Sequence, residues 1–279
     1  MTDLDCSGKG SACSIENQIP MDTLVVTADG VRWEDSVSGP LLHIKLDAPP
    51  VNALTPGMVD AIQTALTVVG PEYRAVVVSS SLPRAFMAGA DLDLLIDGAL
   101  AEQTSYVRSL QSVIAKLKAI PQPIVCAVGG HCLGGGLEFA LACDIVVAAD
   151  DAVLGLPEVK LGILPAAGGI HHLARRIGEA RARVMLITGN RVSAIEALAA
   201  GVVDIVEPRS ELIRRAQDLA SELGDLPATA VREIKCLSAV SLDSSVVEGF
   251  DVELAAWQRA RASSEADNAL GAFRRRPRP

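Results

Sequence analysis

The chain contains few aromatic residues and fewer basic than acidic side chains. Aromatic residues make up 3% of its 279 residues, and 25 lysines and arginines stand against 34 aspartates and glutamates, which gives a formal net charge of −9 at pH 7. A nucleic-acid binder needs cationic side chains for the phosphates and aromatic side chains on which bases stack. The composition therefore predicts a globular protein without a nucleic-acid partner.

The sequence also lacks signs of disulfides, of a membrane span and of a secretory signal. No two of the six cysteines form a CxxC pair, which is typical of reduced thiols in a cytosolic protein. Residues 119–137 carry no Asp, Glu, Lys or Arg, but the two prolines and five glycines among them exclude a transmembrane helix. Asp3 and Asp5 lie near the N-terminus, and no basic segment followed by an apolar run comes after them. We therefore expect a cytoplasmic protein that does not associate with membranes.

Several signatures of enzyme mechanism are missing as well. The sequence has no GxSxG, no HExxH and no Walker A loop, and the glycine cluster does not complete GxGxxG because Phe139 occupies the third position. His171 and His172 would point about 100° apart on one helix, so they make a poor metal clamp. We expect these two to be surface or cap histidines, and we expect neither a metal nor a separate cofactor.

Hydrophobic periodicity predicts an α/β core followed by helices. Residues 1–20 are polar and rich in glycine and serine, which predicts a disordered leader, and Met21 is a candidate start. Strands and helices alternate through 21–208, and only helices follow in 209–279. The expected strands are 24–27, 31–34, 41–46, 75–79, 124–128 and 144–149, with loops at 80–90 and 129–134. The expected helices begin at 56 and include 107–117, 135–142, 212–223, 229–241, 246–262 and 265–275. The pattern indicates one domain with a helical appendage.

Two glutamates near a glycine-rich turn form the candidate site. Glu138 falls in the first turn of a helix that follows three consecutive glycines, and Glu158 comes 20 residues later. Free backbone N–H groups at such a helix start can hold an oxyanion, and Gly89 and Ala90 let a second backbone N–H approach a ligand closely. Alone, the glycines could form a plain turn, Glu138 could complement the helix dipole, and Glu158 could be a solvated turn residue. However, an acid within an otherwise apolar run is costly without a purpose.

Together these segments resemble the crotonase superfamily, specifically the enoyl-CoA hydratase/isomerase family. The resemblance covers about residues 24–279 and is closest to the hydratases that carry two glutamates. The matching segments are PPVNAL (49–54), AFMAGADL (85–92), CLGGGLE (132–138), ALACD (140–144), LGLPEVKLGILPAAGG (154–169) and AFRRR (272–276). Two of them, CLGGGLE and LGLPEVKLG, resemble the hydratase portions of fatty-acid oxidation multienzymes, which implies a role in β-oxidation.

The resemblance implies a fold and a set of site residues. The fold would be the crotonase (ClpP-like) spiral of ββα turns, with a C-terminal helical region that packs trimers or hexamers. The oxyanion hole would consist of the backbone N–H groups of Ala90 and Gly135, with Glu138 and Glu158 as catalytic residues. The residues implied to bind substrate and coenzyme A are Ala53, Leu54, Ala88, Asp91, Leu92, Leu133, Gly134, Pro157, Phe273 and Arg276. The acyl pocket would draw on Leu92, Leu95, Leu133, Pro157 and Ile163.

The pair of glutamates predicts that the enzyme adds water to a trans-2-enoyl-CoA. Glu138 would deprotonate the water that attacks C3, and Glu158 would protonate C2. The alternatives are another acyl-CoA lyase or dehydratase, an enoyl-CoA isomerase, and a crotonase-fold binding protein without catalysis. The chain departs from the family pattern at Pro50, where many relatives have a basic residue near the phosphates of coenzyme A, and in PAAGGIHHL (165–173). These departures put the phosphate contact and the acyl chain length in doubt.

Overall fold

The computed structural model describes residues 26–36, 40–240 and 245–275. The predicted leader and Arg276 lie outside the described residues. None of the described helices is long and apolar enough to cross a membrane.

The larger sheet has seven strands among the described residues, in the order β1-β2-β3-β4-β6-β8-β11. The first two pairs are antiparallel, whereas β3, β4, β6, β8 and β11 run parallel to one another. Its strands are β1 (Val26–Ala28), β2 (Val31–Asp35), β3 (Leu41–Leu46), β4 (Ala75–Ser80), β6 (Ile124–Val128), β8 (Ile145–Ala149) and β11 (Ile205–Glu207). Buried parallel strands are predicted from runs of apolar residues. The strands β3 and β6 have the bounds that the sequence predicts.

A smaller sheet stands beside it, with the strand order β10-β9-β7-β5. The strands β5, β7 and β9 run parallel, and β10 pairs antiparallel with β9. Its strands are β5 (Ala85–Ala88), β7 (His131–Leu133), β9 (Val153–Gly155) and β10 (Arg191–Ser193). The predictions of loops at 80–90 and 129–134 are wrong where β5 and β7 lie. Strands of three or four residues are too short to show a period of two in the sequence.

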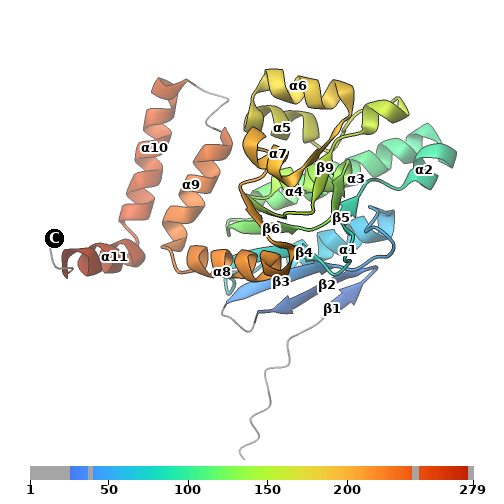
Figure 1. The fold of residues 1–279 in the computed structure, drawn as a ribbon. Helices are drawn as coiled ribbons and strands as arrows, with labels where there is room; N and C mark the ends of the chain where they lie inside the picture. The colour runs from blue at the N-terminus through green and yellow to red at the C-terminus, as the bar shows by residue number, and fades with distance from the viewer. Residues whose placement is uncertain (1–25, 37–39, 241–244, 276–279) are drawn as a thin grey trace, which may run out of the picture.

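The chain passes from one sheet to the other in each turn of a spiral. The strand β4 of the larger sheet leads to β5 of the smaller one, β6 leads to β7, and β8 leads to β9. Helices then return the chain to the larger sheet, as parallel strands require. The predicted spiral of ββα turns is therefore confirmed (Figure 1).

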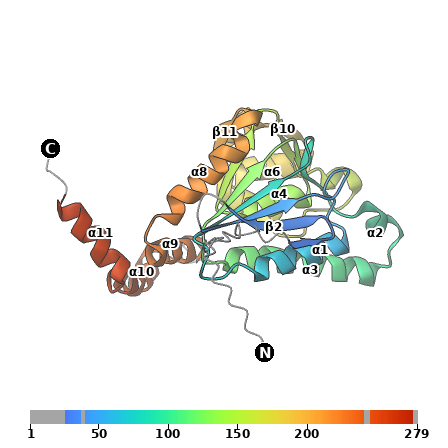
Figure 2. The same cartoon turned by 90° about the horizontal axis from the view of Figure 1, so that it is seen from below.

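Helices cover both faces of the larger sheet. One face packs against α1 (Pro56–Thr67), α3 (Leu100–Ala119) and α4 (Gly135–Ala142), and the other packs against α8 (Leu212–Gly224). Figure 2 shows α8 across the strands from α1 and α3. The start of α1 follows from local sequence, because the hydroxyl of Thr55 accepts the N–H of Met58 and Pro56 occupies the first helical position. The remaining elements outside the C-terminal region are α2 (Leu92–Asp97), η1 (Glu158–Leu161), α5 (Gly169–Ile177), α6 (Glu179–Thr188), α7 (Ala194–Ala200) and η2 (Arg209–Glu211).

The last three helices extend away from the two sheets. They are α9 (Ala228–Val240), α10 (Val246–Arg261) and α11 (Ser264–Arg275), and Figures 1 and 2 both show them to one side. Their exposed large apolar side chains include Phe250, Trp257 and Phe273. Within the described residues after 208, every regular element is a helix; α8 packs on the sheet, whereas α9, α10 and α11 do not cover it.

Candidate active site

The carboxyl ends of three parallel strands build the site. Because β5, β7 and β9 run parallel, their ends meet at one edge of the smaller sheet. Ala90 follows β5, Gly135 begins α4 after β7, and Glu158 begins the 3₁₀ helix η1 after β9. These segments surround a cavity of about 240 Å³, here named the two-glutamate cavity. Its lining consists of Ala88, Gly89, Ala90, Leu92, Leu95, Tyr106, Val107, Leu110, Leu133, Gly134, Gly135, Glu138, Pro157, Glu158, Leu161, Ile163, Leu164, Ala166, Ala167 and Arg191.

The structure brings most of the predicted site residues to this cavity. The predicted residues in its lining are Ala88, Ala90, Leu92, Leu95, Leu133, Gly134, Gly135, Glu138, Pro157, Glu158 and Ile163. Ala53, Leu54 and Asp91 are not among the lining residues, and Asp91 caps α2 by accepting the N–H of Leu94 at 3.1 Å. Phe273, on α11, is 73% exposed and is not part of the lining. The roles of these four residues and of Arg276 in coenzyme A binding stay predictions.

At two of the three consecutive glycines, a side chain is excluded by the atoms nearby. Gly134 has φ +56°, and a Cβ atom there would lie 3.0 Å from Oε1 of Glu158. A Cβ atom on Gly136 would lie 2.1 Å from the backbone oxygen of Met87, a distance that no side chain can adopt. The glycines therefore let the start of α4 approach β5 and Glu158 closely. At the first helical position, the N–H of Gly135 has no acceptor within the helix, so it is available to a ligand.

Glu138 is a buried carboxyl held by backbone N–H groups. Its side chain is on α4, the residue is 3% exposed, and its Oε1 accepts the N–H groups of Ala167 and Gly169, both at 2.8 Å. Burial raises the pKa of Glu138, and the two backbone hydrogen bonds oppose that rise. Both bonds engage Oε1, which leaves Oε2 for a proton or a water molecule. Glu138 is therefore oriented by the loop before α5 rather than exposed as a simple helix-end charge.

Glu158 has a different environment. Its Oε2 is buried without a hydrogen-bond partner among the described residues. The pKa of Glu158 is raised to about 7, mainly by burial; its own backbone N–H opposes the rise and the nearby charge of Glu138 adds to it. Near neutral pH this carboxyl can therefore hold or release a proton, as a general acid or base must. The site thus contains one fixed carboxyl and one carboxyl with an unsatisfied oxygen.

The sequence did not indicate several residues of the cavity. Tyr106, Val107 and Leu110 of α3 form part of its wall, and Arg191 lies at the start of β10. Val107 and Leu110 lie within the predicted helix 107–117, whereas Tyr106, which is buried on the same helix, lies just outside the predicted bounds. The spacing of four residues from Tyr106 to the buried Leu110 could have indicated that Tyr106 lies on the buried face of the helix. A buried phenol hydroxyl needs a hydrogen-bond partner, so a polar contact inside the protein could have been expected there.

Two predictions about histidines have different outcomes. His171 is exposed, as predicted, whereas His172 is half-buried and burial lowers its pKa to about 4. Elsewhere, His43 is buried in β3, where its Nε2 lies 2.8 Å from the hydroxyl of Ser79. These histidines do not line the two-glutamate cavity.

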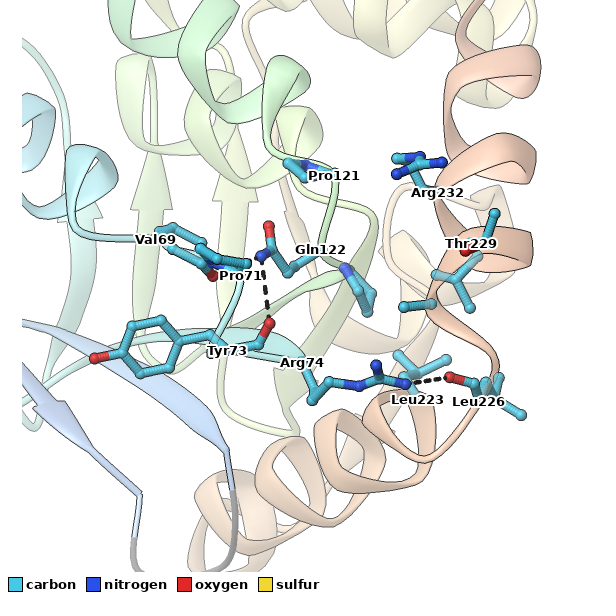
Figure 3. A pocket seen from close by; sticks show the side chains of 14 residues that line it. Val69, Pro71, Tyr73, Arg74, Pro121, Gln122, Leu223, Leu226, Thr229 and Arg232 are labelled. Atoms are coloured by element: carbon cyan, nitrogen blue, oxygen red, sulfur yellow. Dashed lines mark hydrogen bonds between the residues drawn. The ribbon is translucent and has the colours of Figure 1, made fainter. Parts of the chain in front are cut away.

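A second cavity of about 340 Å³ lies between the loops that precede β4 and β6 and the helices α8 and α9 (Figure 3). Arg74 and Arg232 contribute to its walls, and Arg74 donates to the carbonyl of Leu226 at 2.8 Å. The described residues that line it include no aspartate, glutamate or histidine, so it offers no acid or base. It therefore lacks the paired carboxyls that the two-glutamate cavity contains.

The ββα spiral and the paired carboxyls beside a glycine-rich helix start define a protein of the crotonase fold. The chain belongs to the enoyl-CoA hydratase/isomerase family, whose model matches residues 37–278. It is 34% identical over 233 residues to the probable enoyl-CoA hydratase echA8 of Mycobacterium tuberculosis, with 82% of this chain and 90% of the relative covered. It is 32% identical over 248 residues to the enoyl-CoA isomerase/hydratase fer4 of Mycosarcoma maydis, with 85% and 90% covered.

Solved structures agree with this assignment. The enoyl-CoA hydratase of Bacillus anthracis superposes with a TM-score of 0.84 at 30% identity, covering 88% of this chain and 96% of that one. An enoyl-CoA hydratase from Polaromonas superposes with a TM-score of 0.82 at 29% identity, covering 87% and 96%. The predicted family and fold are therefore confirmed, and the chain is a crotonase-type protein of a family that acts on acyl-CoA thioesters.

Proposed function

We propose that the protein is an enoyl-CoA hydratase that adds water to a trans-2-enoyl-CoA. The observation that supports this most is the presence of both Glu138 and Glu158 in one apolar cavity. Adding water across a double bond needs one group to take a proton from the water and another to give a proton to carbon. A pair of carboxyls with different environments suits these two tasks.

The proposed reaction proceeds through an enolate. The thioester carbonyl accepts the N–H groups of Ala90 and Gly135, which stabilise the negative charge on its oxygen as the C3–O bond forms. Glu138 accepts the proton of the attacking water, and protonated Glu158 delivers its proton to C2. The product is a 3-hydroxyacyl-CoA with one added water molecule, and the two carboxyls regain their starting states by exchanging a proton through solvent.

The apolar wall of the cavity supports an acyl chain as the bound group. Six leucine, isoleucine and valine side chains from α2, α3 and the segment after η1 are part of this wall. Burial of an acyl chain against them contributes about 0.8 kcal/mol for each methylene group. We propose fatty-acid β-oxidation as the setting of this reaction.

An enoyl-CoA isomerase is the second candidate. It would move a double bond by taking a proton from one carbon of the acyl chain and returning it to another, which one carboxyl can do. The pKa of Glu158, raised to about 7, favours this candidate because such a carboxyl can take and give a proton near neutral pH. The fixed Glu138 has no task in that mechanism, which is why we favour the hydratase.

The test of the proposed function is the loss of the conjugated-enoyl absorbance of crotonyl-CoA and of a longer trans-2-enoyl-CoA. A hydratase removes this absorbance and produces 3-hydroxyacyl-CoA, which is identified by mass from the added water. The same protein is incubated with a 3-enoyl-CoA, from which an isomerase produces the conjugated absorbance. If the protein isomerises the 3-enoyl-CoA but leaves the trans-2-enoyl-CoA unhydrated, the proposal is wrong and the second candidate takes its place.

The pKa of Glu158 predicts the pH dependence of hydration. Glu158 must be protonated to give its proton to C2, so kcat/KM for hydration is expected to fall about tenfold per pH unit above about pH 7. In the reverse direction, dehydration of the 3-hydroxyacyl-CoA uses the same singly protonated pair, with the proton on Glu138 and Glu158 ionised. Because the reaction exchanges no net proton with solvent, kcat/KM for dehydration should fall with the same slope above about pH 7. Rate profiles measured in both directions between about pH 5 and pH 9 check this. A kcat/KM for hydration that stays level from pH 7 to pH 9 would contradict it.

We also propose that the protein assembles into a trimer or a dimer of trimers through its C-terminal helices. The exposed apolar side chains of α10 and α11, among them Phe250, Trp257 and Phe273, support an interface there. We expect size-exclusion chromatography with light scattering to give about three or six times the chain mass of 29.1 kDa. A monomer at micromolar concentration would contradict this proposal.

A further inference from the structure

The hydroxyl of Tyr106 connects two segments of the site. Tyr106 is 5% exposed, and it is a polar-tipped residue within the buried face of α3. Its hydroxyl donates to the backbone oxygen of Leu54 at 2.5 Å and accepts the backbone N–H of Asp91 at 3.2 Å. Burial raises the pKa of Tyr106 to about 12, so the hydroxyl remains a donor at neutral pH.

The two peptide groups that flank Ala90 are both held by these contacts. The N–H of Leu54 donates to the backbone oxygen of Gly89 at 3.1 Å. That oxygen belongs to the same planar peptide group as the N–H of Ala90, and the two point in opposite directions. The next peptide group ends in the N–H of Asp91, which donates to Tyr106. The direction of the Ala90 N–H is therefore fixed from both sides.

Leu54 also contacts the second half of the proposed oxyanion hole. It forms a parallel β-bridge with Ala90, and its Cδ1 lies 2.7 Å from where a Cβ atom of Gly135 would be. Leu54 thus contacts the segments of both N–H donors. The hydroxyl of Tyr106 accepts the N–H of Asp91, next to Ala90, and donates to the carbonyl of Leu54. It therefore constrains the position of the Ala90 segment relative to the Gly135 segment.

We infer that Tyr106 is a positioning residue that aims the N–H of Ala90 at the thioester oxygen of the bound acyl-CoA. This inference rests on the proposed function, because it concerns the same oxyanion hole. Its hydroxyl does not touch the reacting atoms; it acts through Leu54 and Asp91. Removal of one oxyanion-hole donor lowers the rate by about 10² to 10³. Loss of the Tyr106 hydroxyl leaves the N–H of Ala90 in place but less well directed, so it should lower the rate by less. We expect a loss of about tenfold in kcat for the variant Tyr106→Phe, with KM changed less than about twofold.

Tyr106→Phe is suited to this test because the loop around Leu54 has an independent anchor. The amide of Asn52 donates to the backbone oxygen of Phe86 at 2.7 Å and to the hydroxyl of Ser80 at 2.8 Å. Phenylalanine keeps the ring in the buried face of α3 and removes only the hydroxyl. We therefore expect the variant to fold, with the loop near its place but the Ala90 peptide less restrained.

The matched control is Tyr73→Phe, since the chain contains only two tyrosines. The hydroxyl of Tyr73 also makes a hydrogen bond, to Oδ1 of Asp35 at 2.7 Å, and this residue does not line the two-glutamate cavity. Tyr73→Phe should leave kcat and KM unchanged. Hydrogen exchange of the peptides that cover Leu54 and residues 89–91 should become faster in Tyr106→Phe and not in Tyr73→Phe.

A spectroscopic readout separates this inference from the proposed function. The coenzyme A thioester of 4-(dimethylamino)cinnamic acid absorbs at longer wavelength when its carbonyl is polarised, whether or not the protein turns it over. We expect a smaller red shift when this probe binds to Tyr106→Phe than when it binds to wild type or Tyr73→Phe. An unchanged red shift together with an unchanged kcat in folded Tyr106→Phe would overturn the inference. If wild type shifts the probe but hydrates no enoyl-CoA, the proposed function fails, and the red shifts of the two variants still decide the role of Tyr106.

Discussion

The variants Glu138→Gln and Glu158→Gln are each expected to hydrate crotonyl-CoA at least about 10²-fold more slowly than wild type, because a positioned acid or base contributes 10²- to 10⁴-fold. Glutamine keeps the size of each side chain but can neither take the proton of water nor give one to C2. In Glu138→Gln, the amide oxygen can still accept the N–H groups of Ala167 and Gly169, so the loop before α5 stays in place. The loss should therefore appear in kcat, with binding of the thioester little changed.

The loss must be separated from a general effect of removing a charge. Glu222 on α8 has a side chain that is 66% exposed, and its ion pair with Arg215 is long, at 3.6 Å. Exposed pairs of this kind contribute little, so Glu222→Gln should keep wild-type activity and stability. Steady-state rates for the three variants, with thioester affinity by calorimetry, provide the check. A Glu138→Gln or Glu158→Gln enzyme within threefold of wild type would remove that carboxyl from the mechanism.

The variant Gly136→Ala is also expected to have a large effect, on both stability and activity. The added Cβ atom would lie 2.1 Å from the backbone oxygen of Met87, so either α4 or β5 must move. Inserting a methyl group into a packed site costs about 1 to 3 kcal/mol, which for a chain of this size lowers the melting temperature by several degrees. A shift of α4 also displaces Gly135 and Glu138, so hydration should slow by about 10² as the donor and the base move.

Gly249→Ala is the matched control for this substitution. Gly249 is also helical, within α10, and in the single chain a Cβ atom there would meet nothing within 4 Å. Alanine in an open helical position is about 0.5 to 1 kcal/mol more favourable than glycine. Thermal unfolding of both variants should therefore shift in opposite directions, and only Gly136→Ala should lose activity. Equal melting temperatures and rates for Gly136→Ala and wild type would contradict this prediction, because they would show that a methyl group fits between α4 and β5.

The sequence allowed the parts of the site that depend on local chemistry to be predicted. Glu138, Glu158 and the glycines before α4 stand out because acids are costly in apolar surroundings and a run of glycines marks a tight turn. The strands β5, β7 and β9 could not be predicted in this way. Each is three or four residues long and becomes a strand only by pairing with a segment from another turn of the spiral. Tyr106 was missed for the same reason, since its partners Leu54 and Asp91 are distant in the chain.

The placement of Phe273 shows a second limit of prediction from local sequence. The prediction that it contacts coenzyme A came from the resemblance, and in the single chain α11 lies away from the two-glutamate cavity. Local sequence predicts that α11 is a helix but carries no information about which surface it meets. Charge or periodicity within one segment cannot supply that information.

The N–H groups at Ala90 and Gly135 belong to the main chain, which has a consequence for how such an enzyme can change. Every amino acid except proline carries a backbone N–H, so substitutions at these positions can alter shape without deleting the donor. The carboxyls, in contrast, exist only as long as residues 138 and 158 are acidic. Under the proposed function, replacing or relocating the acids would therefore change the reaction, while the N–H groups proposed to stabilise the enolate would be inherited with the fold.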